Sequence, residues 1–163
     1  MTYDITFVPK APQQSWEEAL AAHRSRVGQN SAEDGSMQVM QPRFDHVADA
    51  IVACDERFER IDGRGFVEVC DRATRIQLHM FANKVALTVP VPDCHDTARE
   101  LVQRLMEVAE IVQTGTGFHG YDPQLGESFP GALDVAERAA AEMVRIRHRI
   151  DRAIDDTFHG GDR

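Results

Sequence analysis

Hydrophobic and polar residues alternate with a period of two in several short stretches of the chain. The first stretch, Thr2 to Val8, has apolar Tyr3, Ile5 and Phe7 separated by polar residues. This is the period of a half-buried strand. Similar alternation predicts three more strands at residues 66–71, 75–81 and 84–91. Because the connections between these three are very short, we expect them to form an antiparallel meander.

Other stretches carry apolar residues at the spacing of one helical face. They predict helices at residues 16–27, from about 42 until Asp62-Gly63, at 95–114 and at 128–157. Ser15 and Glu18 form a capping box at the start of the first helix, and Gly115 is the predicted C-terminal cap of the third. Residues 28–41 lack periodicity and predict a mobile loop, and residues 158–163 predict a frayed tail.

The predicted order is β-α-α-β-β-β-α-β-α, in which the last strand is a short one around Tyr121. Strands grouped in the middle with helices on both sides favour the α+β class. We expect a single domain over residues 1–157, with a mostly antiparallel sheet of about five strands and helices packed on it. The simplest such architecture is ferredoxin-like with additions. A chain of 163 residues is long enough for one core and too short for two ordinary domains.

The chain is acidic, with a formal net charge of −9. Acidity disfavours nucleic acid as a partner, because such binding depends on basic contacts. It favours encounter with basic proteins, although moderate acidity also serves solubility alone. No apolar run approaches the length of a membrane span, and residues 1–4 do not resemble the start of a signal peptide, so we expect a cytoplasmic protein without membrane contact. The three cysteines are expected to be reduced thiols.

Topology predicts one cluster of polar residues. A strand–helix–strand crossover makes its two strands parallel, so the start of the third helix and the end of the following strand share a sheet edge. The residues that we assign to a binding edge on this basis are His95, Asp96, His119, Tyr121, Asp122 and Gln124.

The residues of this edge have two possible interpretations: a metal or acid–base site, or ordinary helix caps and turns. Together with Cys94, its residues include types that bind zinc or exchange protons. None of them has a recognised ligand spacing, so we assign no metal, no cofactor and no catalytic residue. Asp93 or Asp96 more simply caps the helix, and Asp122 more simply begins an Asx turn before Pro123. Cys94 and His95 point in different directions on a helix and do not form a dyad.

The last predicted helix has two further features. Arg138, Arg145, Arg149 and Arg152 lie on its outer side. They are interleaved with acidic residues, which favours a solvated, ion-paired face over a site for an acidic partner. The broad apolar stripe of the same helix is wide enough for the core, and it can also bury a homodimer contact.

Two short motifs carry a resemblance. The first is Tyr3-Asp4-Ile5-Thr6-Phe7 and the second is Gly120-Tyr121-Asp122-Pro123-Gln124. Together they resemble small uncharacterised bacterial proteins that open with a Tyr-Asp strand and carry a Tyr-Asp-Pro-Gln strand after a long helix. Some similar short acidic proteins act as immunity proteins beside secreted toxins. The resemblance implies no functional residues.

We therefore expect a non-enzymatic, cytosolic bacterial protein that binds a protein partner, of the immunity type. Its acidic surface would include residues 28–41 and the edge near Asp122. One alternative is a small enzyme or metal-binding domain in which Cys94, His95, His119 and Asp122 converge. A second alternative is a homodimeric accessory protein.

Overall fold

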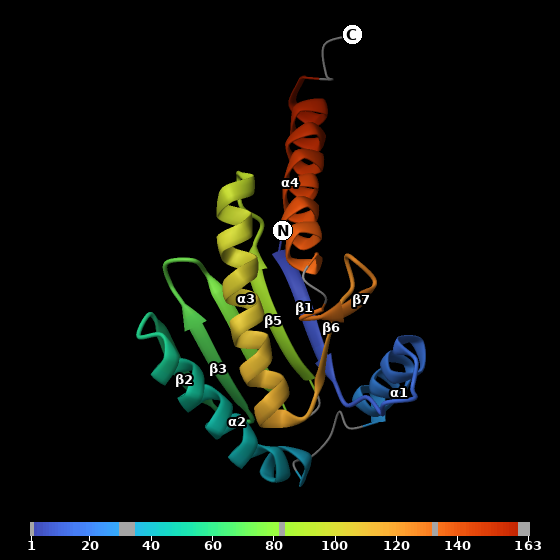
Figure 1. The fold of residues 1–163 in the computed structure, drawn as a ribbon, viewed down its shortest axis with the longest axis vertical. Helices are drawn as coiled ribbons and strands as arrows, with labels where there is room; N and C mark the ends of the chain where they lie inside the picture. The colour runs from blue at the N-terminus through green and yellow to red at the C-terminus, as the bar shows by residue number, and fades with distance from the viewer. Residues whose placement is uncertain (1, 30–34, 82–83, 132–133, 160–163) are drawn as a thin grey trace.

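Seven strands and four helices make up the described part of the chain. The computed structural model describes residues 2–29, 35–81, 84–131 and 134–159, drawn in Figure 1. Its strands are β1 (Thr2–Val8), β2 (Phe58–Gly63), β3 (Phe66–Asp71), β4 (Ile76–Phe81), β5 (Lys84–Pro90), β6 (His119–Asp122) and β7 (Glu127–Phe129). Its helices are α1 (Trp16–Gln29), α2 (Gly35–Cys54), α3 (His95–Thr116) and α4 (Val135–His159).

The strands form one sheet in the order β2-β3-β4-β5-β1-β6-β7, and every neighbouring pair is antiparallel. The α+β class and the predicted meander of β3, β4 and β5 are confirmed. Strand β1 lies between β5 and β6 and is antiparallel to both. It follows that β5 and β6 are parallel to each other, as the crossover through α3 requires.

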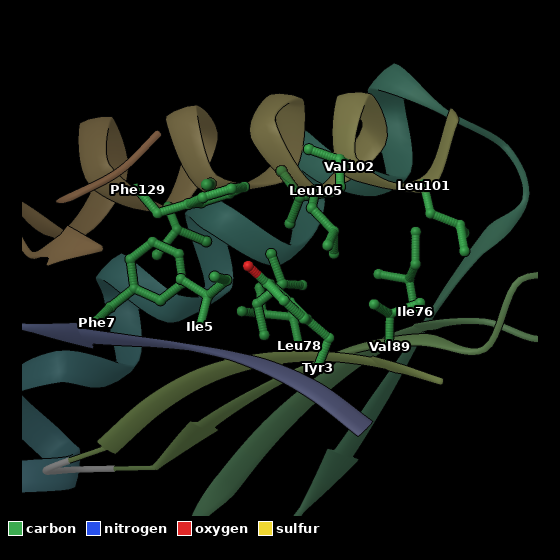
Figure 2. Packing of buried hydrophobic residues seen from close by; sticks show 14 of the residues in the cluster. Tyr3, Ile5, Phe7, Ile76, Leu78, Val89, Leu101, Val102, Leu105 and Phe129 are labelled. Atoms are coloured by element: carbon green, nitrogen blue, oxygen red, sulfur yellow. The ribbon is translucent and has the colours of Figure 1, made fainter. Parts of the chain in front are cut away.

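The core lies between one face of the sheet and the layer formed by α2, α3 and α4, which cover that face in Figure 1. Alternate residues of the central strands supply the sheet side, and Leu101, Val102 and Leu105 of α3 supply part of the helix side. Figure 2 shows these side chains meeting, with the Tyr3 ring among them. Because one face is buried, the period-two pattern of the strands fixes their register.

The sheet has more strands than predicted, and the ferredoxin-like architecture is not confirmed. Strand β2 was predicted as the end of a helix, because Phe58 continues the helical spacing of α2. The helix instead ends at Cys54, and Phe58–Gly63 pairs with Phe66–Asp71. Strand β7 has only three residues and was not predicted.

Several helix boundaries also differ from prediction. Residues 28–41, predicted as a loop, include the end of α1 and the first turns of α2; residues 30–34 lie outside the described part. The continued helix brings half-buried Met40 onto the core, and this packing outweighs the weak local helix propensities. Helix α4 begins at Val135 rather than 128, and it continues through His159, into the predicted tail. The cap of α3 is Gly117 in the left-handed conformation, not Gly115. The Ser15–Glu18 capping box is confirmed.

Candidate functional site

Strands β5 and β6 both run toward the Thr2 end of β1, which is the direction that the predicted edge requires. Pro90 of β5 lies opposite Thr2, and Tyr121 of β6 lies opposite Thr6. His119 is at the other end of β6, opposite Val8. Strand β5 thus reaches the end of β1, whereas β6 ends one residue beyond the Tyr121–Thr6 pair, part of the way along β1. Asp122 lies at that end of β6, and His119 lies at the opposite end.

Asp122 and Tyr3 form a hydrogen-bonded pair in the core. The Tyr3 hydroxyl donates to Asp122 Oδ2, and both residues are fully buried. Burial raises the pKa of Tyr3 well above its usual range, and the hydrogen bond to Asp122 adds to this shift. Burial also raises the pKa of Asp122, although the hydrogen bonds that it accepts from Tyr3, Leu125 and Gln124 act against the shift. Tyr3 is therefore a protonated donor, and Asp122 is the acceptor.

The other Asp122 oxygen begins a turn, as the simpler interpretation predicts. Oδ1 accepts hydrogen bonds from the backbone N–H groups of Gln124 and Leu125, at 2.8 and 3.1 Å. With its amide oriented to donate, the Gln124 side-chain nitrogen lies 3.0 Å from the Asp4 carbonyl oxygen. The two short motifs of the sequence are thus joined into one structural unit. Both Asp122 oxygens are occupied by this unit.

Tyr121 points to the face of the sheet opposite the core. Its ring lies 4.9 Å from that of Trp16 in α1, and the Trp16 indole nitrogen donates to the Ser128 hydroxyl at 3.0 Å. These contacts attach the start of α1 to β6 and β7. His119 is exposed at the start of β6. The structure therefore gives Tyr121 a packing role and does not bring His119 to it.

Cys94, His95 and Asp96 lie exposed at the start of α3. Hydrogen bonding with Thr97, through its hydroxyl and its backbone N–H, lowers the pKa of the Cys94 thiol. Within the described ranges, no group of three or more His, Cys, Asp or Glu is placed to hold a metal ion. Asp93 forms an ion pair with Arg147 of α4 at 3.0 Å, so one carboxylate of this segment attaches α4 to the start of α3.

An ionic cluster that the sequence did not predict lies under α3. Arg104 donates to Asp71 Oδ2 and to Asp55 Oδ2, each at 2.7 Å, and its guanidinium lies 5.4 Å from the centre of the Phe58 ring. Asp71 is 1% exposed. Burial acts to raise the pKa of Asp71, but hydrogen bonds from Thr74 and Arg104 outweigh it and the pKa is lowered. Arg57 also pairs with Asp55, at 2.9 Å, so two cations and two carboxylates balance in this cluster. The cluster is a structural support for β3.

The exposed side of α3 carries a line of six polar residues, four of them acidic, which we call the acidic stripe: Asp96, Glu100, Gln103, Glu107, Glu110 and Thr114. Their spacing alternates between four and three residues, so the line runs along the helix axis. The stripe contains four carboxylates and no basic residue. None of the four carboxylates has an ion-pair partner within the described part of the chain, although most acidic residues elsewhere in it are paired.

Grooves flank the acidic stripe on both sides. The α3–α4 groove has a volume of about 580 Å³, half-buried Met106 and Ala136 in its floor, and Asp96, Glu100 and Glu137 among its walls. The α2–α3 groove has a volume of about 410 Å³ and is lined by His46, Ala50, Glu107, Glu110 and Ile111, among others. Both are open surface features with apolar side chains and mostly acidic charged residues, with Arg99 in the α3–α4 groove as the exception. Open grooves of this kind suit a macromolecular partner more than an enclosed small molecule.

The chain matches no protein-family profile, no curated protein and no solved structure. No described helix is long and apolar enough to cross a membrane.

Proposed function

We propose that this protein acts by binding a basic protein partner, and that the acidic stripe of α3 is the binding surface. The observation that carries the proposal is the line of four exposed carboxylates without a basic residue among them. An unpaired line of one charge attracts the opposite charge at long range and steers encounter. Asp96 is the member of the predicted binding edge that this proposal retains.

The contrast with the rest of the surface supports this choice. Most other charged side chains form ion pairs, for example Arg60 with Asp45, Asp49 and Asp62. The immunity role implied by the resemblance is a special case of the proposal, with a secreted toxin as the basic partner. A non-enzymatic role fits the positions of Cys94, which is exposed at the start of α3, of His119, which is at the far end of β6, and of Asp122, whose oxygens are both hydrogen-bonded in the core.

Isothermal titration calorimetry against the product of the adjacent gene tests the proposal at low and at moderate salt. We expect binding that weakens with salt, and that weakens about tenfold in the variant Glu107→Gln/Glu110→Gln, because two charge contacts are lost. Glu17→Gln/Glu56→Gln is the matched control, because it removes the same charge from exposed positions outside the stripe. Absence of binding, or equal weakening by both double variants, would overturn the proposal.

A further inference from the structure

Strand β2 forms one edge of the sheet. It is the first strand in the order β2-β3-β4-β5-β1-β6-β7, so β3 is its only neighbour among the described strands. Proteins keep sheet edges from pairing with other chains by shortening the edge strand or by placing Pro, Lys or a bulge in it. The opposite edge strand, β7, has only three residues. Strand β2 has six, contains neither Pro nor Lys, and pairs with β3 without a bulge, so its edge is able to pair with another strand.

The geometry of the β2–β3 hairpin determines which backbone groups face this edge. A two-residue connection joins the strands, so the Gly63–Phe66 pair closes the turn with both of its backbone hydrogen bonds. Hydrogen-bonded and non-hydrogen-bonded pairs alternate along an antiparallel ladder. Arg60 and Asp62 therefore belong to non-hydrogen-bonded pairs, and their N–H and C=O groups point away from β3. The Phe58 N–H follows the same rule, because it donates to the carbonyl oxygen three residues earlier, at 3.0 Å, and not to β3.

The residues in the middle of this edge, Arg60-Ile61-Asp62, are complementary to a second copy of themselves. Antiparallel pairing of two β2 strands, centred on Ile61, places Arg60 opposite the partner's Asp62 and the two Ile61 side chains opposite each other. The opposed Arg60 and Asp62 are the residues with outward-facing backbone groups, so the backbone hydrogen bonds of a ladder can form between them. The next registers on either side are centred on Arg60 or on Asp62, and they place like charges opposite each other, which is destabilising.

The charged side chains of this segment already lie on one face of the strand. Arg60 Nη2 donates to Asp62 Oδ1 within the same chain, at 2.8 Å. In the paired strands, each of these charges has an opposite charge as its neighbour along its own strand and another across the interface. Ile61, on the other face, is 41% exposed in the single chain, and the pairing covers it.

Apolar side chains continue from Ile61 across the sheet face that lies away from the core. Gly63 has no side chain, and a Cβ at this position would lie 2.0 Å from Phe66 Cε1, so the Phe66 ring extends over β2. The Phe66 ring is 5.9 Å from that of Phe81, which is 42% exposed. We call Ile61, Phe66 and Phe81 the apolar strip. Pairing of two β2 strands joins the apolar strips of both copies at Ile61.

Two carboxylates of α2 oppose this pairing. Asp45 and Asp49 also form ion pairs with Arg60, so each copy has three carboxylates, including Asp62, around one arginine. Asp49 and Asp62 are 71% and 61% exposed, so their repulsion across the interface is between solvated charges. Salt at about 0.3 M screens such charges more strongly than physiological salt does, and it is the condition in which the backbone and Ile61 contacts are expected to dominate.

We propose that two copies of this chain form a two-fold dimer by antiparallel pairing of their β2 strands, centred on Ile61. The contact is isologous, because the same segment of both copies forms it. It joins the two sheets into one, with the helices of both copies on the same side. The inference does not depend on the proposed function, because the acidic stripe lies on α3 and stays available to a basic partner.

Sedimentation velocity of the full chain over a wide concentration range, at about 0.3 M salt, tests the dimer with two charge variants. Asp62→Arg places arginines opposite each other, and Arg60→Asp places aspartates opposite each other. We expect each variant alone to dimerise at least about tenfold more weakly than the unmodified chain. An equimolar mixture of the two is expected to form a mixed dimer, because both of its cross-strand contacts are complementary again. Circular dichroism establishes that each variant is folded.

A second pair of variants tests the backbone contact and leaves Arg60 in place. Asp62→Pro and Asp62→Ala lose the same carboxylate, but only the proline variant also loses the outward-facing N–H. Asp62→Pro is therefore expected to dimerise more weakly than Asp62→Ala. Glu17→Arg is the matched control for Asp62→Arg, because it makes the same charge change at an exposed position of α1, and its dimer is expected to be unchanged.

Three results would overturn the inference. The first is a monomer at every concentration, and the second is a dimer that the β2 variants leave as strong as before. The third is a mixture of Asp62→Arg and Arg60→Asp that does not recover the dimer although both variants are folded. A β2 dimer that does not bind the product of the adjacent gene would support the inference and overturn only the proposed function.

Discussion

The hydroxyl of Tyr3 donates a hydrogen bond to the carboxylate of Asp122, although the two residues are 119 positions apart in the chain. The bond crosses from β1 to the end of β6, and both residues are fully buried. Figure 2 shows the Tyr3 oxygen directed away from its strand into the space beneath the helices. Asp122 is at the same time the first residue of the β6–β7 turn, so this bond attaches the turn to the first strand.

Replacement of Tyr3 by Phe is expected to lower the free energy of unfolding by about 1–3 kcal/mol, because Asp122 Oδ2 is left buried without its donor. Urea unfolding measures the change. Tyr121→Phe is the matched control: its hydroxyl has no hydrogen bond within the described part of the chain, and the expected change is below about 0.5 kcal/mol. Equal losses in both variants would show that the Tyr3–Asp122 bond is not what stabilises the turn.

Asp122→Asn is expected to change how stability depends on pH. The pKa of Asp122 is raised in the folded protein by burial, so the folded state holds its proton more tightly than the unfolded state does. Stability from this group is full below its unfolded pKa, about 3.9, and is lost as pH rises through the higher folded value. The variant should therefore gain stability relative to the unmodified protein as pH rises above about 4. Urea unfolding at a series of pH values measures this, and parallel profiles would contradict it.

Asp71→Asn is expected to show the opposite dependence. The pKa of Asp71 is lowered, because hydrogen bonds from Thr74 and Arg104 outweigh burial. The stability that its charge contributes is present above the unfolded pKa, about 3.9, and is lost as pH falls through the folded value. The cost of Asp71→Asn should thus be largest above about pH 4 and shrink in more acidic buffer. A cost that is independent of pH would show that the charge of Asp71 is not what matters.

Arg104→Met is expected to lower the free energy of unfolding by about 3–5 kcal/mol, because it leaves the Asp71 carboxylate buried without its cation. Arg99→Met is a matched control on the same helix, since Arg99 pairs with Glu137 at the surface and such pairs contribute about 0–1 kcal/mol. Thermal and urea unfolding give both values. Adding Asp71→Asn to Arg104→Met should recover part of the loss, and a further loss would argue against the assigned pairing.

Gly117→Ala is expected to cost about 1–2 kcal/mol. Gly117 ends α3 with φ of 73° and donates its N–H to the Gln113 carbonyl oxygen, and a Cβ at this position would meet no atom within 4 Å. The cost is therefore conformational alone. Asn tolerates the left-handed conformation better, so Gly117→Asn should be intermediate in urea unfolding. A stabilising Gly117→Ala would contradict the left-handed cap.

The local sequence pattern was sufficient to predict elements that pack one apolar face against the core and have clear start or stop signals. The capping box of Ser15 and Glu18, the meander and α3 were predicted for this reason. The crossover rule also predicted that the strands before and after α3 are parallel, and the Asx turn at Asp122 followed from the residue type. Edge strand β2 was missed because Phe58 fits the helical face of α2 and the rest of the strand is mostly exposed.

The buried polar partners could not be predicted from spacing. Arg104 sits among the apolar positions of α3, and no local pattern indicates that Asp55 and Asp71 receive it. Tyr3 was predicted as an apolar member of β1, which is right for its ring, but its hydroxyl partner is on a distant strand. The acidic stripe was present in the sequence as residues four and three apart. The apolar positions of the third helix were used to predict the helix, but the polar positions on its other side, which contain the stripe, were not analysed for charge.

The central place of β1 has a consequence for biosynthesis. This strand leaves the ribosome before the other described elements, yet one of its neighbours is β6, which contains Asp122. At synthesis rates of about 5–20 residues per second, roughly 6–24 s separate Tyr3 from Asp122. During that interval β1 can pair with β5 at most, and its other edge exposes unpaired backbone groups. The nascent chain therefore carries, in the middle of its future sheet, an open edge that only the late hairpin of β6 and β7 closes.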